Sequence, residues 1–317
     1  MAKLVTLGEL LIDFTECGIS RDGQRLFEQN PGGAVANVAC AAAKMGIDTA
    51  FIGKVGNDMH GIFLKETLAG QGVNVENLVI AEDVFTTLAF VAIAADGERQ
   101  FSFARKPGAD TCLREGELDT ELLKGCEMFH CGSLSLTDEP SRGATLAAIK
   151  LAKQSGAVIS YDPNYRASLW TGVDVAKIHM RSVLPFADMV KISDEETELL
   201  TDRKNPSEAI DALLANGAKI AVVTLGKNGA MAGVGSFRVS VPTFEGYPVA
   251  DTTGAGDSFW GAFISRVLKA GGIDAIDGQR LEESVRFANA AATLCVGRRG
   301  GIPAMPDESQ TNSVCLA

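Results

Sequence analysis

Short hydrophobic runs alternate along the chain with longer amphipathic stretches. A run that is hydrophobic at every position is typical of a strand buried on both faces, and a helix usually links two parallel strands. The pattern therefore predicts an α/β fold, a doubly wound, mostly parallel sheet with helices on both faces. The expected strands are residues 4–7, 49–56, 157–162, 187–193 and 220–226, and the expected helices are residues 32–46, 60–70, 141–155 and 206–216.

One segment departs from this alternation. Residues 86–104, TTLAFVAIAADGERQFSFA, are predicted to form two strands joined by Asp96-Gly97, a dipeptide suited to a two-residue type I′ turn. The first strand is hydrophobic on both faces, so a bound ligand, another subunit or both must cover its second face. A further β segment near residues 11–29 could complete a small sheet. Since no repeat or linker divides the chain, we predict a single domain over residues 1–317, from which this small sheet projects.

Composition narrows the function classes. The 317 residues are 46% hydrophobic and 22% charged, as expected of a globular protein with a large core. The net charge of −11 disfavours a nucleic-acid surface, so an anionic ligand needs a local cluster of donors. The first hydrophobic stretch is too short to span a membrane and is interrupted by Glu9 and Asp13. The seven cysteines lack CxxC spacing, which indicates reduced thiols and a cytoplasmic protein.

The most informative motif is DTTGAGDSF, residues 251–259. Gly254 and Gly256 would leave the first N–H groups of the following helix open to an anion. Asp257 falls in the first helical turn, where the helix dipole keeps a carboxylate ionised and makes it a weak base. This arrangement suits phosphoryl transfer, in which the protein mainly positions the groups and stabilises charge. The alternative is structural: Thr252 or Thr253 caps a helix and the carboxylate complements its dipole.

DTTGAGDSF resembles the C-terminal signature of the ribokinase-like (PfkB-type) carbohydrate kinases, and NPGGAVANVA at 30–39 resembles their N-terminal signature. The similarity extends over nearly the whole chain, and the segments FARKPGAD at 103–110 and DPNYRASLW at 162–170 look most like those of fructokinases. The resemblance implies a doubly wound α/β domain with a small β lid, formed here by about 11–29 and 86–104. It also implies an ATP- and Mg²⁺-dependent sugar kinase that makes fructose 6-phosphate.

By the same resemblance, Asp257 would accept the proton of the attacking hydroxyl, and the N–H groups of Gly254, Ala255, Gly256 and Asp257 would form the anion hole. The residues implied in substrate binding, besides Asp257, are Asp13, Gly32, Gly33, Asn37, Arg105 and Arg166. Without the resemblance, these positions would be interpreted as a lid carboxylate, a helix-start turn, a polar helix residue and solvated arginines.

On the nucleotide side the resemblance implicates Lys191, Glu196, Thr224, Gly226, Gly229, Gly254, Gly256 and Asn289. Glu196 would hold Mg²⁺ through water, although Ser193 stands where the family often has Asn. Asp251, together with residues 297–301, would hold K⁺. The structural alternatives are an acidic helix start at Glu196, an ordinary turn at Gly226 and Gly229, and close helix packing around Asn289.

Several alternatives stay open on the sequence alone. Within the family, 2-keto-3-deoxygluconate kinase is the closest rival, because Arg105 and Arg166 could neutralise a carboxylate; ribokinase is more distant. From another class comes a sugar- or nucleotide-binding regulator without turnover. The small-molecule sugar is the expected partner, with no nucleic acid and no membrane. We expect a homodimer joined through the lid, unless the segment near 11–29 or the core covers the second face of the hairpin and leaves a monomer.

Overall fold

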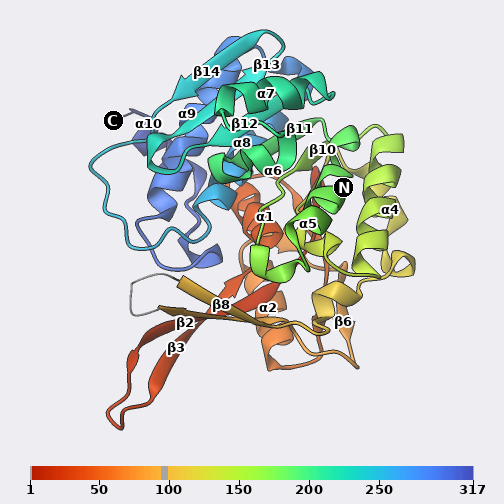
Figure 1. The fold of residues 1–317 in the computed structure, drawn as a ribbon, viewed down its shortest axis with the longest axis vertical. Coiled ribbons are helices and arrows are strands. Elements are labelled where there is room, and N and C mark those ends of the chain that lie inside the picture. The colour runs from red at the N-terminus through yellow and green to blue at the C-terminus, as the bar shows by residue number, and fades with distance from the viewer. Residues whose placement is uncertain (1, 94–98, 317) are drawn as a thin grey trace.

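A large mixed sheet lies at the centre of the computed structural model, which describes residues 2–93 and 99–316 (Figure 1). Its strand order is β14-β13-β12-β11-β10-β9-β1-β4-β5, and β6 also pairs with β4. Neighbouring strands are parallel except for the antiparallel meander from β12 to β14. The bounds are β1 (Leu4–Leu7), β4 (Thr49–Gly56), β5 (Val73–Asn74), β6 (Leu78–Ala81), β9 (Met128–Cys131), β10 (Val158–Tyr161), β11 (Met189–Ser193), β12 (Ile220–Thr224), β13 (Ala230–Val234) and β14 (Phe237–Val241).

Alternate residues of the central strands enter two separate hydrophobic cores, one on each face of the sheet. Val5, Phe129 and Ile159 are neighbours across three strands and pack in the first core with α4, α5 and α7. Leu4 and Met128 lie opposite each other and pack in the second core with α1, α8 and α9. Because a strand turns successive side chains to opposite faces, both faces must be covered by helices. The predicted doubly wound architecture is confirmed.

Helices pack on both faces of the main sheet. Among the described residues, none combines the length and the apolar character needed to cross a bilayer. The bounds are α1 (Ala34–Lys44), α2 (Met59–Gly70), α3 (Thr120–Gly125), α4 (Ser141–Gln154), α5 (Val173–Arg181), α6 (Thr197–Thr201), α7 (Pro206–Ala215), α8 (Ala255–Lys269), α9 (Gly278–Cys295) and α10 (Glu308–Leu316).

A second, smaller sheet forms the lid, with strand order β3-β2-β7-β8. Its strands are β2 (Leu11–Ile19), β3 (Arg25–Gly32), β7 (Leu88–Ile93) and β8 (Arg99–Ala104), and the β2–β3 hairpin projects from the body of the molecule (Figure 1). Asp13 pairs with Ala89 and Phe14 pairs with Phe90, so alternate positions face opposite sides of the sheet. The expected turn at Asp96-Gly97 lies outside the described residues.

Candidate active site

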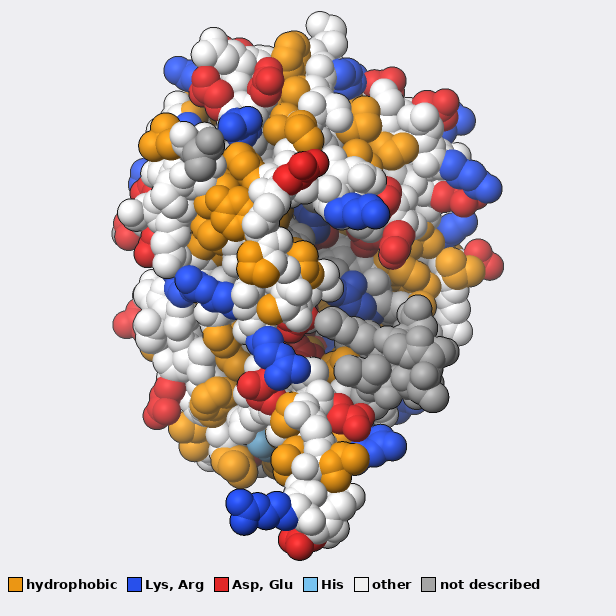
Figure 2. Space-filling view, turned by 90° about the vertical axis from the view of Figure 1, so that its left-hand side faces the viewer, with side chains coloured by type: hydrophobic (Ala, Val, Ile, Leu, Met, Phe, Trp, Pro, Cys, Tyr) orange, Lys and Arg blue, Asp and Glu red, His pale blue; other side chains and the backbone are white. Residues whose placement is uncertain are grey.

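A cleft of about 280 Å³ separates the inner face of the lid from the main sheet. Its walls come from segments that follow β1, β9 and β10, from the loop before α8, and from the inward positions of the lid strands. Figure 2 shows a hollow near the middle of the face drawn, with basic and acidic side chains around it. The cleft therefore lies at the carboxyl ends of parallel strands, the usual ligand site of a doubly wound sheet.

The loop that ends at Gly254 opens the start of α8 to the cleft. Gly254 is the N-cap and has a φ of 77°, a left-handed conformation that favours glycine, and no side chain caps the helix. Gly254 and Gly256 both line the cleft. A Cβ at Gly254 would lie 3.0 Å from the Cα of Gly301, so a larger residue would crowd the neighbouring loop. The first N–H groups of an uncapped helix start can bind an anion.

Asp257 lies one turn into α8 and lines the same cleft. Its Oδ2 accepts a hydrogen bond of 2.8 Å from Nδ2 of Asn37, which comes from the neighbouring helix α1. Burial raises the pKa of Asp257, although Lys191, Asn37 and Arg166 oppose that effect. The helix dipole alone had suggested a weak base; in the folded protein, desolvation makes the carboxylate more basic.

Asp13 and the Gly32-Gly33 pair form the lid side of the cleft. Both Asp13 and Gly33 line it, and a Cβ at Gly32 would overlap the Asp13 carboxylate. Gly33 has a φ of 116° and approaches the backbone of Glu9 too closely for a side chain. Burial raises the pKa of Asp13 to about 6, against the opposing effect of Arg166. The structure therefore brings together Asp13, Gly32, Gly33 and Asn37, the positions that the family resemblance had implicated in sugar binding.

The two arginines expected to bind substrate differ in position. Arg166 lines the cleft and influences the pKa values of both Asp13 and Asp257. Arg105 does not belong to the described lining of the cleft. Its side chain is only 4% exposed, and each of its guanidinium nitrogens has a protein partner. The substrate role expected of Arg105 is therefore geometrically less favourable than that of Arg166.

Lys191 lies behind the start of α8. A Cβ at Gly256 would lie 3.0 Å from the Lys191 Nζ, and this ammonium donates a 2.6 Å hydrogen bond to Asp162. Burial alone would lower the pKa of Lys191, but the carboxylates of Asp162, Asp257 and Glu196 raise it overall. Lys191 therefore stays protonated and adds positive charge behind the anion-binding helix start.

Glu196 holds two loops together at the ends of β10 and β11. Its Oε1 accepts from the N–H of Tyr165 at 2.6 Å, and its Oε2 accepts from the N–H and hydroxyl of Ser193. Ser193 thus bonds directly to Glu196. Among the described residues, no three His, Cys, Asp or Glu side chains cluster closely enough to hold a metal. A protein-only metal cage is therefore not formed by that part of the chain.

Of the residues expected to hold the nucleotide, Gly254 and Gly256 line the lid cleft, whereas Thr224, Gly226, Gly229 and Asn289 lie outside its lining. Gly226 and Gly229 have φ values of 55° and 90° and bracket a short turn after β12, and the Thr224 hydroxyl bonds to the carbonyl of Ile192. Asn289 donates hydrogen bonds of 3.0 and 3.1 Å to the carbonyls of Val241 and Pro242. The amide of Asn289 therefore ties α9 to the end of β14.

Asp251 joins the loop before α8 to the loop after α9. Its Oδ1 accepts from the N–H and hydroxyl of Thr253 at 3.0 and 2.8 Å, and its Oδ2 accepts from the N–H of Gly300 at 3.2 Å. Asp251 and Gly300 both line the cleft. The two loops, which the family resemblance had linked to K⁺, therefore lie side by side near the helix start.

Sequence reasoning missed several polar residues of the cleft, among them Glu9, Asn30 and Asn164. Glu9 is completely buried, and its Oε1 accepts a 2.5 Å hydrogen bond from the N–H of Ala34 at the start of α1. Burial raises the pKa of Glu9 to about 7. A glutamate inside the hydrophobic run LGELLI was the available signal. Asn164 has a φ of 48° and lies in the segment 162–170, which the sequence analysis had compared with fructokinases.

An uncapped helix start, a buried carboxylate and a lid at one cleft suit an enzyme that transfers a phosphoryl group to a small hydroxylated substrate. Comparison with known proteins agrees. The pfkB family carbohydrate kinase model matches residues 1–308. A probable fructokinase-5 of Arabidopsis thaliana is 42% identical over 96% of this chain and 94% of the relative. The chain therefore belongs to the pfkB family of carbohydrate kinases and is similar to fructokinases.

Solved structures show the same relationship. Fructokinase from Xylella fastidiosa with bound ATP superimposes with a TM-score of 0.91 at 33% identity, covering 100% of this chain and 99% of that one. A double mutant of the Vibrio cholerae O395 fructokinase, with fructose, ADP and a potassium ion bound, has a TM-score of 0.88 at 29% identity. That match covers 99% of this chain and 98% of the other. The similarity thus includes both the main sheet and the lid.

Proposed function

We propose that this protein is a fructokinase that transfers the γ-phosphoryl group of ATP to the 6-hydroxyl of fructose. One observation carries the proposal: Asp257, a buried carboxylate, lies in the first turn of α8, and the uncapped helix start opens to the same cleft. The choice of sugar rests on relatives. Fructokinases are similar over nearly the entire chain, and fructose and ADP are bound in the Vibrio cholerae structure.

In this mechanism the sugar lies between the lid and α8. Asp13 and Asn37 bind its hydroxyls, with Gly32 and Gly33 allowing close approach, and Arg166 contacts the sugar or the transferring phosphoryl group. As the new oxygen–phosphorus bond forms and the bond to ADP breaks, Asp257 receives the proton of the attacking hydroxyl. The N–H groups of residues 254–257 stabilise the negative charge on the phosphoryl oxygens.

The cations belong to the proposal as well. Mg²⁺, when bound with ATP, would neutralise phosphate charge, and Glu196 would hold it through water because both carboxylate oxygens already accept protein hydrogen bonds. This fits a cation that is usually held by substrate phosphates, water and one or two carboxylates. K⁺ would lie near Asp251 and residues 297–301, since Asp251 already joins these loops. Lys191, Thr224, Gly226, Gly229 and Asn289 remain the candidate residues on the nucleotide side.

We also propose that the enzyme is a cytoplasmic homodimer joined through its lid, with a sugar and a nucleotide as ligands and neither nucleic acid nor membrane as partner. Its seven cysteines are all free, in keeping with a reducing compartment. The exposed aromatic side chains on the outer face of the lid support the dimer.

The rival sugar is 2-keto-3-deoxygluconate, whose carboxylate would need the two arginines together. Only Arg166 lines the cleft, whereas the Arg105 guanidinium is occupied by protein partners, which favours the neutral sugar. A regulator without turnover would have no use for a buried carboxylate with raised pKa beside an anion-binding helix start.

The test is ADP release by the purified protein with fructose, 2-keto-3-deoxygluconate and ribose. Fructose should give the highest kcat/KM, and Asp257→Ala should lower kcat by roughly 10² to 10⁴ while ATP affinity stays nearly unchanged. The matched control is Asp174→Ala, since Asp174 also lies in the first turn of a helix but is exposed on α5. A higher kcat/KM for 2-keto-3-deoxygluconate would reassign the sugar. ATP turnover with none of the sugars would favour a regulator.

A further inference from the structure

The two strands of the lid hairpin leave the main body at adjacent points. Thr87 immediately precedes β7, Arg105 immediately follows β8, and the first pair between these strands is Leu88 with Ala104. Thr87 and Arg105 are therefore the two ends, or roots, of the hairpin. The carbonyl of Thr87 also accepts a 3.2 Å hydrogen bond from the N–H of Ile12, so β2 is attached at the same place.

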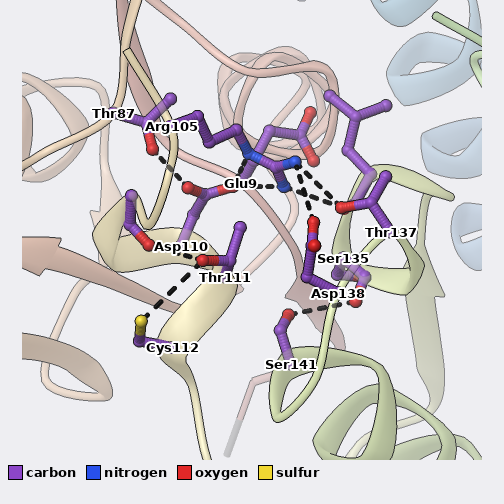
Figure 3. A network of polar contacts seen from close by, with 12 residues as sticks. Glu9, Thr87, Arg105, Asp110, Thr111, Cys112, Ser135, Thr137, Asp138 and Ser141 are labelled. Carbon is purple, nitrogen blue, oxygen red and sulfur yellow. Dashed lines mark hydrogen bonds and ion pairs between the residues drawn. The ribbon is translucent and has the colours of Figure 1, made fainter. Parts of the chain in front are cut away.

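One buried carboxylate binds both roots. The Thr87 hydroxyl donates to Oδ1 of Asp110, and Nε of Arg105 donates to Oδ2 of Asp110 at 2.8 Å. The side chain of Asp110 is 1% exposed and that of Arg105 is 4% exposed. Figure 3 shows these three side chains converging, with Thr137 on the opposite side of the guanidinium. Charge-assisted hydrogen bonds between buried groups fix geometry more firmly than bonds between neutral groups.

Asp110 itself is anchored in the main body. It lies in the short 3-10 helix Ala109–Cys112, and the carbonyl of Cys112 accepts a 3.3 Å hydrogen bond from Lys54 in β4. The adjoining Leu113 packs in the first hydrophobic core. The carboxylate therefore connects the lid to the buried main body of the fold. It does so at the roots of the hairpin, where a small rotation would move the whole lid.

The same cluster reaches the wall of the cleft. Nη2 of Arg105 donates to the carbonyl of Leu134 at 2.9 Å, and Nη1 donates to the Thr137 hydroxyl at 2.8 Å. Leu134 lines the cleft opposite Val91 and Phe103, which are lid residues. The contacts of Arg105 therefore fix the separation between the roots of the lid and one wall of the cleft.

We propose that Asp110 is a positioning residue: by binding Thr87 and Arg105 together, it sets the angle at which the lid covers the sugar. The inference rests on the proposed sugar kinase function. It gives Arg105 a role distinct from substrate binding. A lid held at the right angle brings Asp13 to the sugar, because Asp13 pairs with Ala89 of β7, and keeps water away from the transferring phosphoryl group.

Two variants test the positioning role of Asp110. Thr87→Val keeps the shape of the side chain and the buried ion pair while removing one hydrogen bond, and Asp110→Asn removes the charge but keeps an acceptor. In both, KM for the sugar should rise, by about 3-fold for Thr87→Val and roughly 10- to 100-fold for Asp110→Asn. KM for ATP should change less than about 2-fold, and more ATP should be hydrolysed per sugar phosphorylated.

A measurement independent of activity tests the positioning role of Asp110 separately from the proposed function. Without any substrate, amide hydrogen exchange of β7 and β8 should be about 10-fold faster in Asp110→Asn than in the wild type, with exchange in β11 and β12 unchanged. The control is Asp211→Asn, which breaks an exposed pair with Arg238 far from the lid and should alter none of these quantities. If the wild type phosphorylates no sugar, the proposed kinase function is rejected. The exchange data still test whether Asp110 holds the lid.

Three results would overturn the proposal. Unchanged lid exchange in both variants would show that Asp110 does not hold the lid. Faster exchange throughout the main sheet would mark a general loss of stability. If Arg105→Met raises the sugar KM while lid exchange and Thr87→Val remain like the wild type, Arg105 binds the substrate directly. Should Asp110→Asn fail to fold, Thr87→Val alone decides, because it leaves the buried charges paired.

Discussion

Single carboxylates in this protein behave according to burial more than according to helix position. Asp257 lies in a first helical turn, where the dipole lowers a pKa, yet burial raises its pKa overall. Glu9 is an even clearer case, since it too lies against a helix start and accepts from Ala34, but its Oε2 has no hydrogen-bond partner. A carboxylate with one desolvated oxygen is stabilised when protonated.

This predicts a pH-dependent stability difference for Glu9→Gln. The pKa of Glu9 is about 7 in the folded protein and near its ordinary value of 4.5 when unfolded, so the stability it contributes is fully present below about pH 4.5. That contribution is lost as the pH rises through 7. Relative to the wild type, Glu9→Gln should therefore gain roughly 1 to 3 kcal/mol in free energy of unfolding between about pH 5 and about pH 8.

Urea denaturation of both proteins at the two pH values measures the change. Glu66→Gln, an exposed site on α2, is the control and should show the same difference from the wild type at each pH. A Glu9→Gln difference that does not vary with pH would mean that Glu9 is ionised throughout this range.

At the scale of elements, strands buried on both faces were predictable because mostly hydrophobic residues fill them. Residues 49–56 were expected as a strand and correspond to β4, and the expected strand 220–226 contains all of β12 and the two residues after it. The direction of the Arg105 side chain was not predictable. It depends on Asp110 and Thr137, and the second of these is brought near only by the packing of the segment after β9. Local pattern predicts elements, whereas contacts between elements decide which polar groups face the cleft.

Two such elements, the loop before α8 and the loop after α9, carry a prediction about K⁺. Asp251 bonds to both loops, so a monovalent cation there would add charge beside the first N–H groups of α8. Turnover should be roughly 3- to 10-fold faster with K⁺ than with Na⁺ at equal ionic strength. Asp251→Asn should remove most of this preference. Steady-state rates in the two chlorides, after exhaustive removal of K⁺, provide the measurement; equal rates would contradict it.

At the scale of the whole molecule, the lid has one face toward the cleft and an opposite, outer face that is partly exposed. Asp13, Ala89 and Val91 share the inner face by strand alternation, and Phe14 and Phe90 share the outer face. On the outer face, Phe14 and Phe90 stack at 5.4 Å between ring centroids, and Phe27 packs edge-on at 6.2 Å from Phe90. The segment near 11–29 thus lies beside the hairpin and only partly covers its outer face.

That outer face leads to the last prediction, a two-fold dimer joined lid to lid. Phe90 is 38% exposed and Phe27 is 39% exposed, and Ile19 and Leu26 extend the hydrophobic surface toward the tip of the β2–β3 hairpin. Figure 2 shows hydrophobic side chains at the lower end of the face drawn, where this hairpin lies. Exposed hydrophobic clusters of this kind mark interaction sites, and an isologous dimer buries the same cluster on both copies.

The two faces can be tested separately, because neighbouring positions of β7 point to opposite sides. Phe90→Glu should yield monomers that still bind sugar, whereas Ala89→Glu, on the inner face, should abolish sugar binding and leave the dimer intact. Ile178→Glu on α5 is the control, since Ile178 is an equally hydrophobic, exposed residue away from the lid. Light scattering at micromolar concentration, with sugar and nucleotide present, gives the mass. A monomeric wild type would reject the dimer, and the outer aromatic cluster would then serve only to stiffen the lid.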